Sequence, residues 1–410
     1  MESFNYIYKK LFNLGVFSRV LLVIVKPLAL WLSIQLDTDA GLAVAQIYII
    51  GLLFVSLSGT NAHKSFYKKY FGTEKPTYSK DVARSYANYI QKITFQLILI
   101  TIISSLFISV IFWGSFDIVI MGIIFGIAEK INDEFQRYAQ FSNNSKSLFY
   151  LALNKLIPVL IAAPLSYAAI VDIRFTFPVL VLVGAIFINW PTIFSAIHYL
   201  IKTARKSFFG MILRSFNYIH QDVLQIGCVF IQISLFSIDK WLMQYFSLSD
   251  LPQYMLYTQI ASIFVVFQTI ILIAPVRSKL VNENPNQIKS IKIGSPIISL
   301  FSIMVGIFIY FFNYKINSVE NLGYFAFFFA GIITFTVAYS ERLYWLTKTK
   351  VRLTLDAVIF FLLIFLILVS SMFIHSENLL VLSLVILWFL MCLRVFLMIN
   401  LIRKNSFNKS

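Results

Sequence analysis

The chain is dominated by apolar runs of about 20 residues, separated by short polar stretches. A helix of that length matches the hydrocarbon thickness of a bilayer, at about 1.5 Å of rise per residue. Lipid offers no hydrogen-bonding partners, so each run must satisfy its own backbone groups, and the alternating pattern of a membrane β-strand is absent. Charged residues make up 13% of the sequence, against roughly 25% in soluble domains. The sequence therefore predicts an all-α polytopic membrane protein.

Twelve runs predict twelve transmembrane helices, with both termini on one side of the membrane. The predicted spans are 14–35, 41–58, 93–111, 116–135, 149–170, 176–199, 223–246, 254–276, 293–313, 323–340, 353–374 and 379–402. The first run lacks the pattern of a cleaved signal peptide, so we expect it to remain as a helix. We interpret the segment 59–92 as a basic connector on the inner side.

The distribution of Lys and Arg predicts the orientation, because these residues resist translocation and stay in the cytoplasm. With both termini inside, two of the 34 basic residues, Arg174 and Lys315, fall in outer loops and five fall within spans. The other 27 lie in inner loops and tails. The net charge of +16 is thus a topology signal, and we expect the basic loops to meet anionic lipid headgroups rather than nucleic acid.

Basic residues inside the spans are the main functional signal, and they are Arg19, Lys26, Lys155, Lys240 and Arg394. A charge at mid-bilayer costs about 2.5 to 3.5 kcal/mol, so each needs a reason. Arg19 and Lys155 lie near inner ends, where a long side chain can reach the headgroups. Lys26 lies about 18 Å into its span and must face a polar interior or pair with a buried carboxylate. Pro27 removes a backbone donor beside it and predicts a hinge.

Acidic residues inside the spans are fewer. Adjacent residues of a helix point about 100° apart, so we expect Asp239 and Lys240 to contact different neighbours. Glu129 begins a polar helical face, which predicts either the mouth of a cavity or a solvated extension. We attribute Asp356 to stabilisation by a helix dipole. An interior with more bases than acids favours an anionic cargo, above all phosphate, and Asp239 and Glu129 are the candidate coupling or pairing acids.

Several kinds of chemistry lack a signal in the sequence. There is no Gly-x-x-x-x-Gly-Lys-Ser/Thr motif for nucleotide hydrolysis. The four histidines lie far apart and form no metal-binding pair at i, i+4 spacing. No predicted outer loop exceeds about ten residues, which disfavours a catalytic outer domain. We therefore expect a transporter without a cofactor rather than an enzyme.

Four stretches, in this order, resemble polysaccharide or O-antigen flippases of the multidrug/oligosaccharidyl-lipid/polysaccharide export superfamily. They are Arg19 through Lys26-Pro27 to Trp31 with the acidic turn 36–41, Ala128-Glu129-Lys130 through Asn154-Lys155, Ser237-Ile238-Asp239-Lys240-Trp241-Leu242, and Asp250-Leu251-Pro252-Gln253-Tyr254. The resemblance implies two six-helix lobes, 1–206 and 207–410, around a central cavity that opens alternately to each side of a bacterial inner membrane.

The resemblance also implies a cationic lumen that receives the diphosphate of a polyprenyl-linked oligosaccharide. On this sequence its positions are Lys26, Lys155, Lys240 and Arg19. The implied partners are this lipid-linked sugar, membrane lipids and the machinery that polymerises polysaccharide.

Three alternatives stay open. A drug or organic-cation exporter of the same superfamily should hold acids in its cavity, where this chain has bases. An unrelated secondary transporter would be expected to carry an Arg-rich loop between its second and third spans. A membrane-embedded polysaccharide polymerase or acyltransferase would need larger outer loops.

Overall fold

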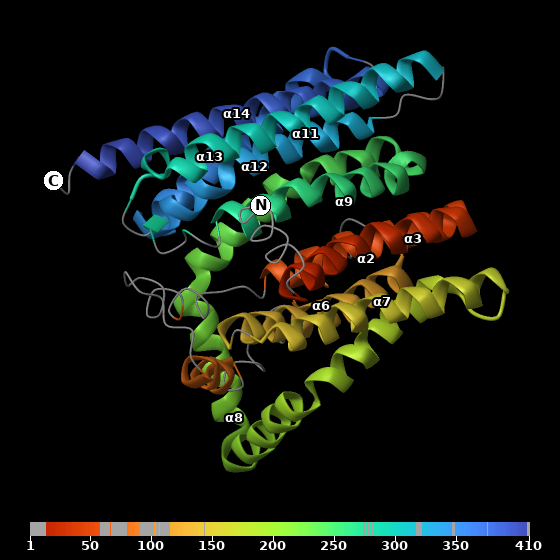
Figure 1. Ribbon diagram of the computed structural model, residues 1–410, viewed down its shortest axis with the longest axis vertical. Coiled ribbons are helices and arrows are strands. Elements are labelled where there is room, and N and C mark those ends of the chain that lie inside the picture. Colours follow the sequence, from red (N-terminus) through yellow and green to blue (C-terminus); the bar gives the residue numbers. More distant parts are fainter. Residues whose placement is uncertain are drawn as a thin grey trace, which may run out of the picture. The chain divides into compact units, whose positions relative to one another are not determined.

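The computed structural model describes residues 14–57, 80–90, 115–142, 144–273, 283–316, 322–346, 349–374 and 376–407, with short pieces at 66, 102–103, 106, 276 and 279–280. Within these ranges the chain is helical and contains no strand, which confirms the all-α prediction (Figure 1). The predicted third span, 93–111, lies almost wholly outside the described residues.

The helices fall close to the predicted spans. Those of the first half are α2 (Leu14–Leu36), α3 (Thr38–Leu57), α6 (Phe116–Phe141), α7 (Ser145–Tyr167) and α8 (Ile173–Phe246). Those of the second half are α9 (Leu251–Gln268), which continues as a π-helical turn (Thr269–Ile273), α11 (Lys289–Ile316), α12 (Gly323–Leu346), α13 (Thr349–Ser371) and α14 (Ser376–Phe407). Residues 80–90 are also helical, so the segment predicted as a connector contains a helix of its own.

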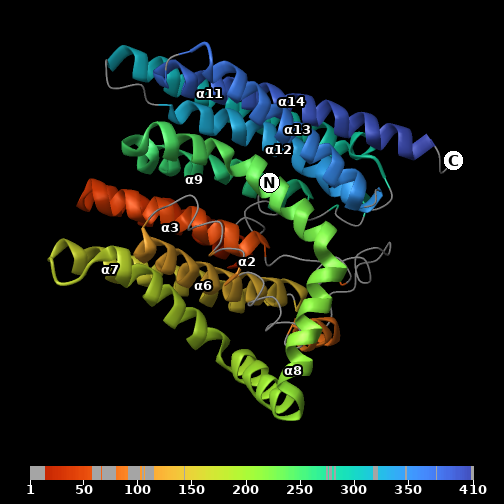
Figure 2. The same ribbon diagram turned by 180° about the vertical axis from the view of Figure 1, so that it is seen from behind.

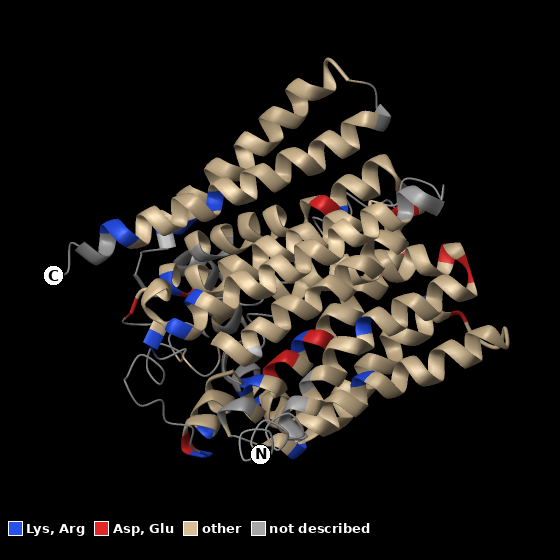
Figure 3. Ribbon diagram, turned by 45° about the horizontal axis from the view of Figure 1, so that its top comes forward, with Lys and Arg blue, Asp and Glu red and all other residues tan. Residues whose placement is uncertain are grey.

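Among the described residues, eight helical segments are long and apolar enough to cross a membrane. They belong to α3, α7, the first part of α8, α9 with its π-helical turn, and α11 to α14. Most of the helical length carries neither Lys, Arg, Asp nor Glu (Figure 3). The prediction of a multi-pass membrane protein is therefore confirmed, whereas its orientation stays a prediction.

The described helices form two compact units. The first contains α2, α3, α6, α7 and α8 as far as Ile226, and the second contains α8 from Gly227 together with α9 and α11 to α14. α8 comprises two helices that meet at Ser207, whose backbone is extended (φ −169°, ψ 96°).

In the first unit α2, α3, α6 and α7 pack side by side (Figures 1 and 2). α3 is apolar all round and is buried continuously over residues 43–50, as expected of a helix enclosed by neighbours. Glycines allow its close approach to α6, since a Cβ at Gly122 would lie 2.6 Å from Ile50 and one at Gly126 would lie 2.6 Å from Phe54. This Gly-x-x-x-Gly spacing is typical of closely packed membrane helices.

We expect Gly122→Leu to separate α3 from α6, because the added side chain has no room beside Ile50. Overpacking of this kind costs about 1–3 kcal/mol, so the melting temperature of the purified protein should fall. Gly227→Leu is the matched control, since a Cβ at Gly227 meets nothing within 4 Å. Equal melting temperatures for the two variants would contradict the close packing of α3 on α6.

In the second unit α12 packs against α9, α11 and α14. Two serines of α11 donate hydrogen bonds to backbone carbonyls of α12: Ser299 to Gly331 (2.7 Å) and Ser302 to Phe327 (2.8 Å). Small and hydroxyl-bearing residues are common where membrane helices pack together, because they permit close approach and add hydrogen bonds between the helices.

Candidate functional site

Three charged residues from three helices of the first unit meet at one carboxylate. Lys26 of α2 lies 3.1 Å from Oε2 of Glu129, and Lys155 of α7 lies 2.8 Å from Oε1. Glu129 belongs to α6, and its side chain is 9% exposed. The Lys155 side chain is 11% exposed and that of Lys26 is 37% exposed. We call these three residues the Glu129 cluster.

The Glu129 cluster shows the partners of the two lysines that were predicted to lie inside the spans, Lys26 and Lys155. Of the two alternatives for Lys26, a polar interior or a buried carboxylate partner, the structure shows a partner, Glu129. Lys155, for which contact with the headgroups and a place in the lumen were both open, pairs with Glu129. These two ion pairs could not be predicted from the sequence, because residues from α2, α6 and α7 meet only through helix packing. The proposed roles of these residues in substrate binding stay predictions.

The charges of the Glu129 cluster do not cancel. Two ammonium groups share one carboxylate, so these three side chains carry a surplus of one positive charge when all are ionised. Each ammonium has three donors, and phosphate oxygens are well suited to accept from them. The partial exposure of Lys26 leaves one cation accessible to a ligand, while Glu129 and Lys155 are largely enclosed.

α2 continues as a helix through Pro27, next to the cluster. Tyr48 of α3 donates a hydrogen bond to the carbonyl of Lys26 (3.3 Å). The hinge at Pro27 stays a prediction. Arg19 also lies in α2, but its side chain is outside the described part of the chain.

Two more ion pairs lie along α6, the first on the face next to Glu129 and the second one turn on from Glu129. Lys130 lies 2.6 Å from Glu134, one helical turn on, and Arg137 lies 2.8 Å from Asp133. Tyr86, from the helix at 80–90, donates a hydrogen bond to Glu134. Burial and the nearby Glu134 carboxylate raise the pKa of Tyr86 far above its usual range, so its hydroxyl stays a neutral donor. Tyr86 was missed by the sequence analysis because its segment was interpreted as a connector.

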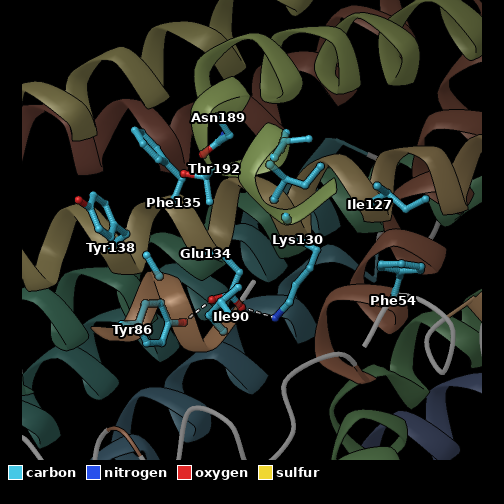
Figure 4. A pocket seen from close by; sticks show the side chains of 14 residues that line it. Phe54, Tyr86, Ile90, Ile127, Lys130, Glu134, Phe135, Tyr138, Asn189 and Thr192 are labelled. Carbon is cyan, nitrogen blue, oxygen red and sulfur yellow. Dashed lines mark hydrogen bonds and ion pairs between the residues drawn. The ribbon is translucent and has the colours of Figure 1, made fainter. Parts of the chain in front are cut away.

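An apolar cavity of about 120 Å³ adjoins the Lys130–Glu134 pair (Figure 4). Side chains from α3, the helix at 80–90, α6 and the first part of α8 line it, including Phe54, Ile90, Ile127, Phe135 and Ile193. Lys130, Glu134 and Tyr86 border one side, and Asn189 and Thr192 lie on the α8 side. The first unit therefore presents a cationic cluster and an apolar cavity on adjoining faces of α6.

In the second unit, Asp239 and Lys240 pair with each other. The Lys240 Nζ lies 3.0 and 3.1 Å from the two Asp239 oxygens, and Tyr254 donates to Asp239 Oδ2 (2.9 Å). The expectation that the two would contact different neighbours was wrong, because the long lysine stem curls back to the adjacent carboxylate. Asp239 and Lys240 are 5% and 7% exposed. The positive charge of Lys240 is thus compensated locally.

A buried ion pair joins α13 to α14. Arg394 Nε donates to Asp356 Oδ1 at 2.7 Å, and the guanidinium lies 5.1 Å from the centre of the Phe236 ring. Both charged residues are at most 3% exposed. Asp356 lies about two turns inside α13, so its expected stabilisation by the helix dipole was the wrong explanation, since that effect fades after the first turn.

The turn between α7 and α8 contains the pair Asp172–Arg174. Arg174 Nε donates to Asp172 Oδ2 (2.8 Å), and this bond holds the pKa of Asp172 below its usual range. Among the described residues, no group of three His, Cys, Asp or Glu side chains is arranged to hold a metal ion.

A scan of protein-family models gives no match to this chain, and a search of curated protein sequences gives none either. Among solved structures, the chain is similar to the crystal structure of the eukaryotic MATE transporter AtDTX14. The two are 14% identical, the match covers 96% of this chain and 95% of that one, and the TM-score is 0.47.

Proposed function

We propose that this chain is a flippase rather than an enzyme. It moves a polyprenyl-diphosphate-linked oligosaccharide repeat unit from the inner to the outer leaflet of the bacterial inner membrane, by alternating access. The observation that carries the proposal is the Glu129 cluster, in which two lysines from different helices converge on one buried carboxylate.

The cluster suits an anionic headgroup for an electrostatic reason. A positive surplus inside a membrane protein is costly unless a ligand or partner repays it. A diphosphate carries more than one negative charge and can replace the Glu129 carboxylate as the partner of both lysines. Binding then exchanges one ionic partner for another, so that no bare ammonium has to be held in the apolar interior, and Glu129 takes up a proton when it leaves the two lysines. In this proposal the Glu129 carboxylate takes the place of the phosphate when no substrate is bound.

The wider proposal keeps the sequence-based architecture. Twelve spans form two six-helix lobes, 1–206 and 207–410, with both termini in the cytoplasm. Arg19 is a further cation of the proposed lumen, and Pro27 serves as a hinge. Lys240, whose charge Asp239 balances, is the proposed binding residue of the second unit, and Asp239 is its proposed coupling or pairing acid. Membrane lipids and the polysaccharide polymerase machinery are the proposed partners.

A second candidate is an organic-cation antiporter, which the buried carboxylates of Glu129 and Asp239 favour. Each carboxylate, however, already has a lysine ammonium within 3.1 Å, which competes with a cationic drug. The anionic cargo therefore fits the charges better.

Deleting the gene in its host tests the proposal. The lipid-linked oligosaccharide should accumulate on the inner leaflet, and the wild-type gene should relieve the accumulation. Drug susceptibility is measured in parallel. Unchanged lipid-linked sugar together with raised drug sensitivity would contradict the flippase and favour the antiporter.

The exchange of ionic partners gives a prediction for Glu129→Gln. The variant leaves two lysines without their counter-ion, so the unliganded protein should melt at a lower temperature. Inorganic pyrophosphate should then raise the melting temperature of the variant more than that of the wild type, because it supplies the missing charge. Asp133→Asn is the matched control, since Asp133 pairs with Arg137 on the same helix. An equal or smaller effect of pyrophosphate on Glu129→Gln would show that Glu129 does not occupy a phosphate site.

A further inference from the structure

The apolar cavity beside α6 is not used by the phosphate-binding site proposed above. Its walls come from four elements that are distant in sequence, so it is formed by the packing of these elements and is partly open to the surface. Hydrocarbon groups dominate the lining, among them Phe54, Ile90, Ile127, Ile131, Ile193 and Ala196. Figure 4 shows several of these side chains around the cavity.

The size and lining of the cavity favour a small hydrocarbon group. Protein interiors are close-packed, and the lining of an empty space loses dispersion contacts. An apolar cavity of roughly 150 Å³ stays dry and accepts a benzene-sized molecule. At about 120 Å³, this cavity can take a hydrocarbon group of nearly that size.

The position of the cavity links it to the Glu129 cluster. Glu129 belongs to the cluster, and the next residue, Lys130, borders the cavity. Consecutive residues of a helix point about 100° apart, so the two features occupy adjoining faces of α6. A helix with its side chains is about 10–12 Å across, so the cluster and the cavity are separated by a distance of that order at most. An amphiphile with a phosphate in the cluster can therefore place its first hydrocarbon segment in the cavity.

We propose that this cavity binds the isoprenyl unit next to the diphosphate of the transported lipid. The inference rests on the proposed function for its phosphate site, and the occupant follows from connectivity, because the isoprenyl unit is the group bonded to the diphosphate. The first unit then recognises its cargo by the chain as well as by the charge, and it discriminates against soluble phosphates and sugar nucleotides.

Binding of three probes to the full chain in lipid nanodiscs tests this inference. The probes are inorganic pyrophosphate, farnesyl diphosphate and the straight-chain dodecyl phosphate. Farnesyl diphosphate should bind the wild type at least about tenfold more tightly than pyrophosphate, because burying a few hydrocarbon groups suffices for that difference. Dodecyl phosphate should bind more weakly than farnesyl diphosphate.

Ala196→Phe fills the cavity, since Ala196 is buried in its wall. It should remove the advantage of farnesyl diphosphate and leave pyrophosphate binding within about twofold. Ile197→Phe is the matched control on the exposed side of the same helix turn and should change neither. Thr192→Leu, a smaller filler, should give the same pattern to a lesser degree and serves if Ala196→Phe does not fold.

The outcomes separate the two proposals. If pyrophosphate fails to bind the wild type, the phosphate site itself is wrong. If pyrophosphate binds but farnesyl diphosphate gains nothing, or the gain survives Ala196→Phe and Thr192→Leu, the cavity does not hold the chain. If dodecyl phosphate binds as tightly as farnesyl diphosphate and is equally sensitive to the fillers, the cavity takes ordinary acyl chains and the isoprenyl assignment is wrong.

Discussion

Cells whose only copy of the protein carries Lys26→Gln are expected to accumulate lipid-linked oligosaccharide on the inner leaflet, nearly as a deletion strain does. The substitution removes the more exposed cation of the Glu129 cluster and, with it, the positive surplus. Glu129 keeps Lys155 as its partner at 2.8 Å, so the variant should still fold and insert. A charge-assisted hydrogen bond is worth about 1.5–3 kcal/mol, which corresponds to transport slower by about 10- to 100-fold.

Lys155→Gln should have a similar effect, and the double variant should be little worse than either single one, because both lysines act on the same phosphate. Lys202→Gln is the control, since Lys202 is an exposed lysine of α8 outside the cluster. If a normally inserted Lys26→Gln protein fully relieved the accumulation, Lys26 would have only a structural role, as the partner of Glu129.

The largest effect on stability is expected at the buried pair of α13 and α14. Replacing Arg394 with Leu leaves the Asp356 carboxylate unpaired in an environment where it is 3% exposed. Removing one partner of a buried ion pair costs about 3–5 kcal/mol. Asp356→Leu should be similarly destabilising, because it strands the guanidinium. Unfolding of the purified protein by denaturant, followed by circular dichroism, measures the change.

The double variant Asp356→Leu/Arg394→Met should recover much of the loss, since apolar residues of similar volume often replace a buried pair without cost. Arg174→Gln provides the comparison at an exposed pair, where the expected change is about 0–1 kcal/mol. Single variants as stable as the wild type would show that Asp356 and Arg394 are not paired in the folded protein.

The membrane class and the approximate helix positions could be predicted because both depend on local sequence. A helix in lipid must be apolar over about 20 residues, and that requirement is visible in any one run. Helix α8 shows the limit of this reasoning. Its two apolar segments could be predicted from the sequence, but the helical backbone that continues between them could not. For α6, by contrast, the polar helical face beyond the apolar core was predicted from the spacing of its charged residues, and the helix extends to Phe141.

The partners of the buried charges could be predicted only in part. The depth of Lys26 predicted either a polar interior or a buried partner. The partner could not be identified, because Glu129 is more than 100 positions away along the chain and the pairing depends on how α2, α6 and α7 pack. The error at Asp239 and Lys240 has a different cause. The prediction relied on the directions of the Cα–Cβ bonds, but the lysine side chain is long enough to turn back to the carboxylate of the preceding residue.

The most direct test of the central claim uses the purified protein reconstituted into vesicles with a polyprenyl-diphosphate-linked oligosaccharide that carries a fluorescent sugar. The measured quantity is the rate at which sugar on the inner surface becomes accessible to a quencher added outside. We predict a rate well above that of protein-free vesicles, and a rate reduced by about 10- to 100-fold for Lys26→Gln. A rate equal to that of protein-free vesicles, with the protein correctly inserted, would contradict the flippase.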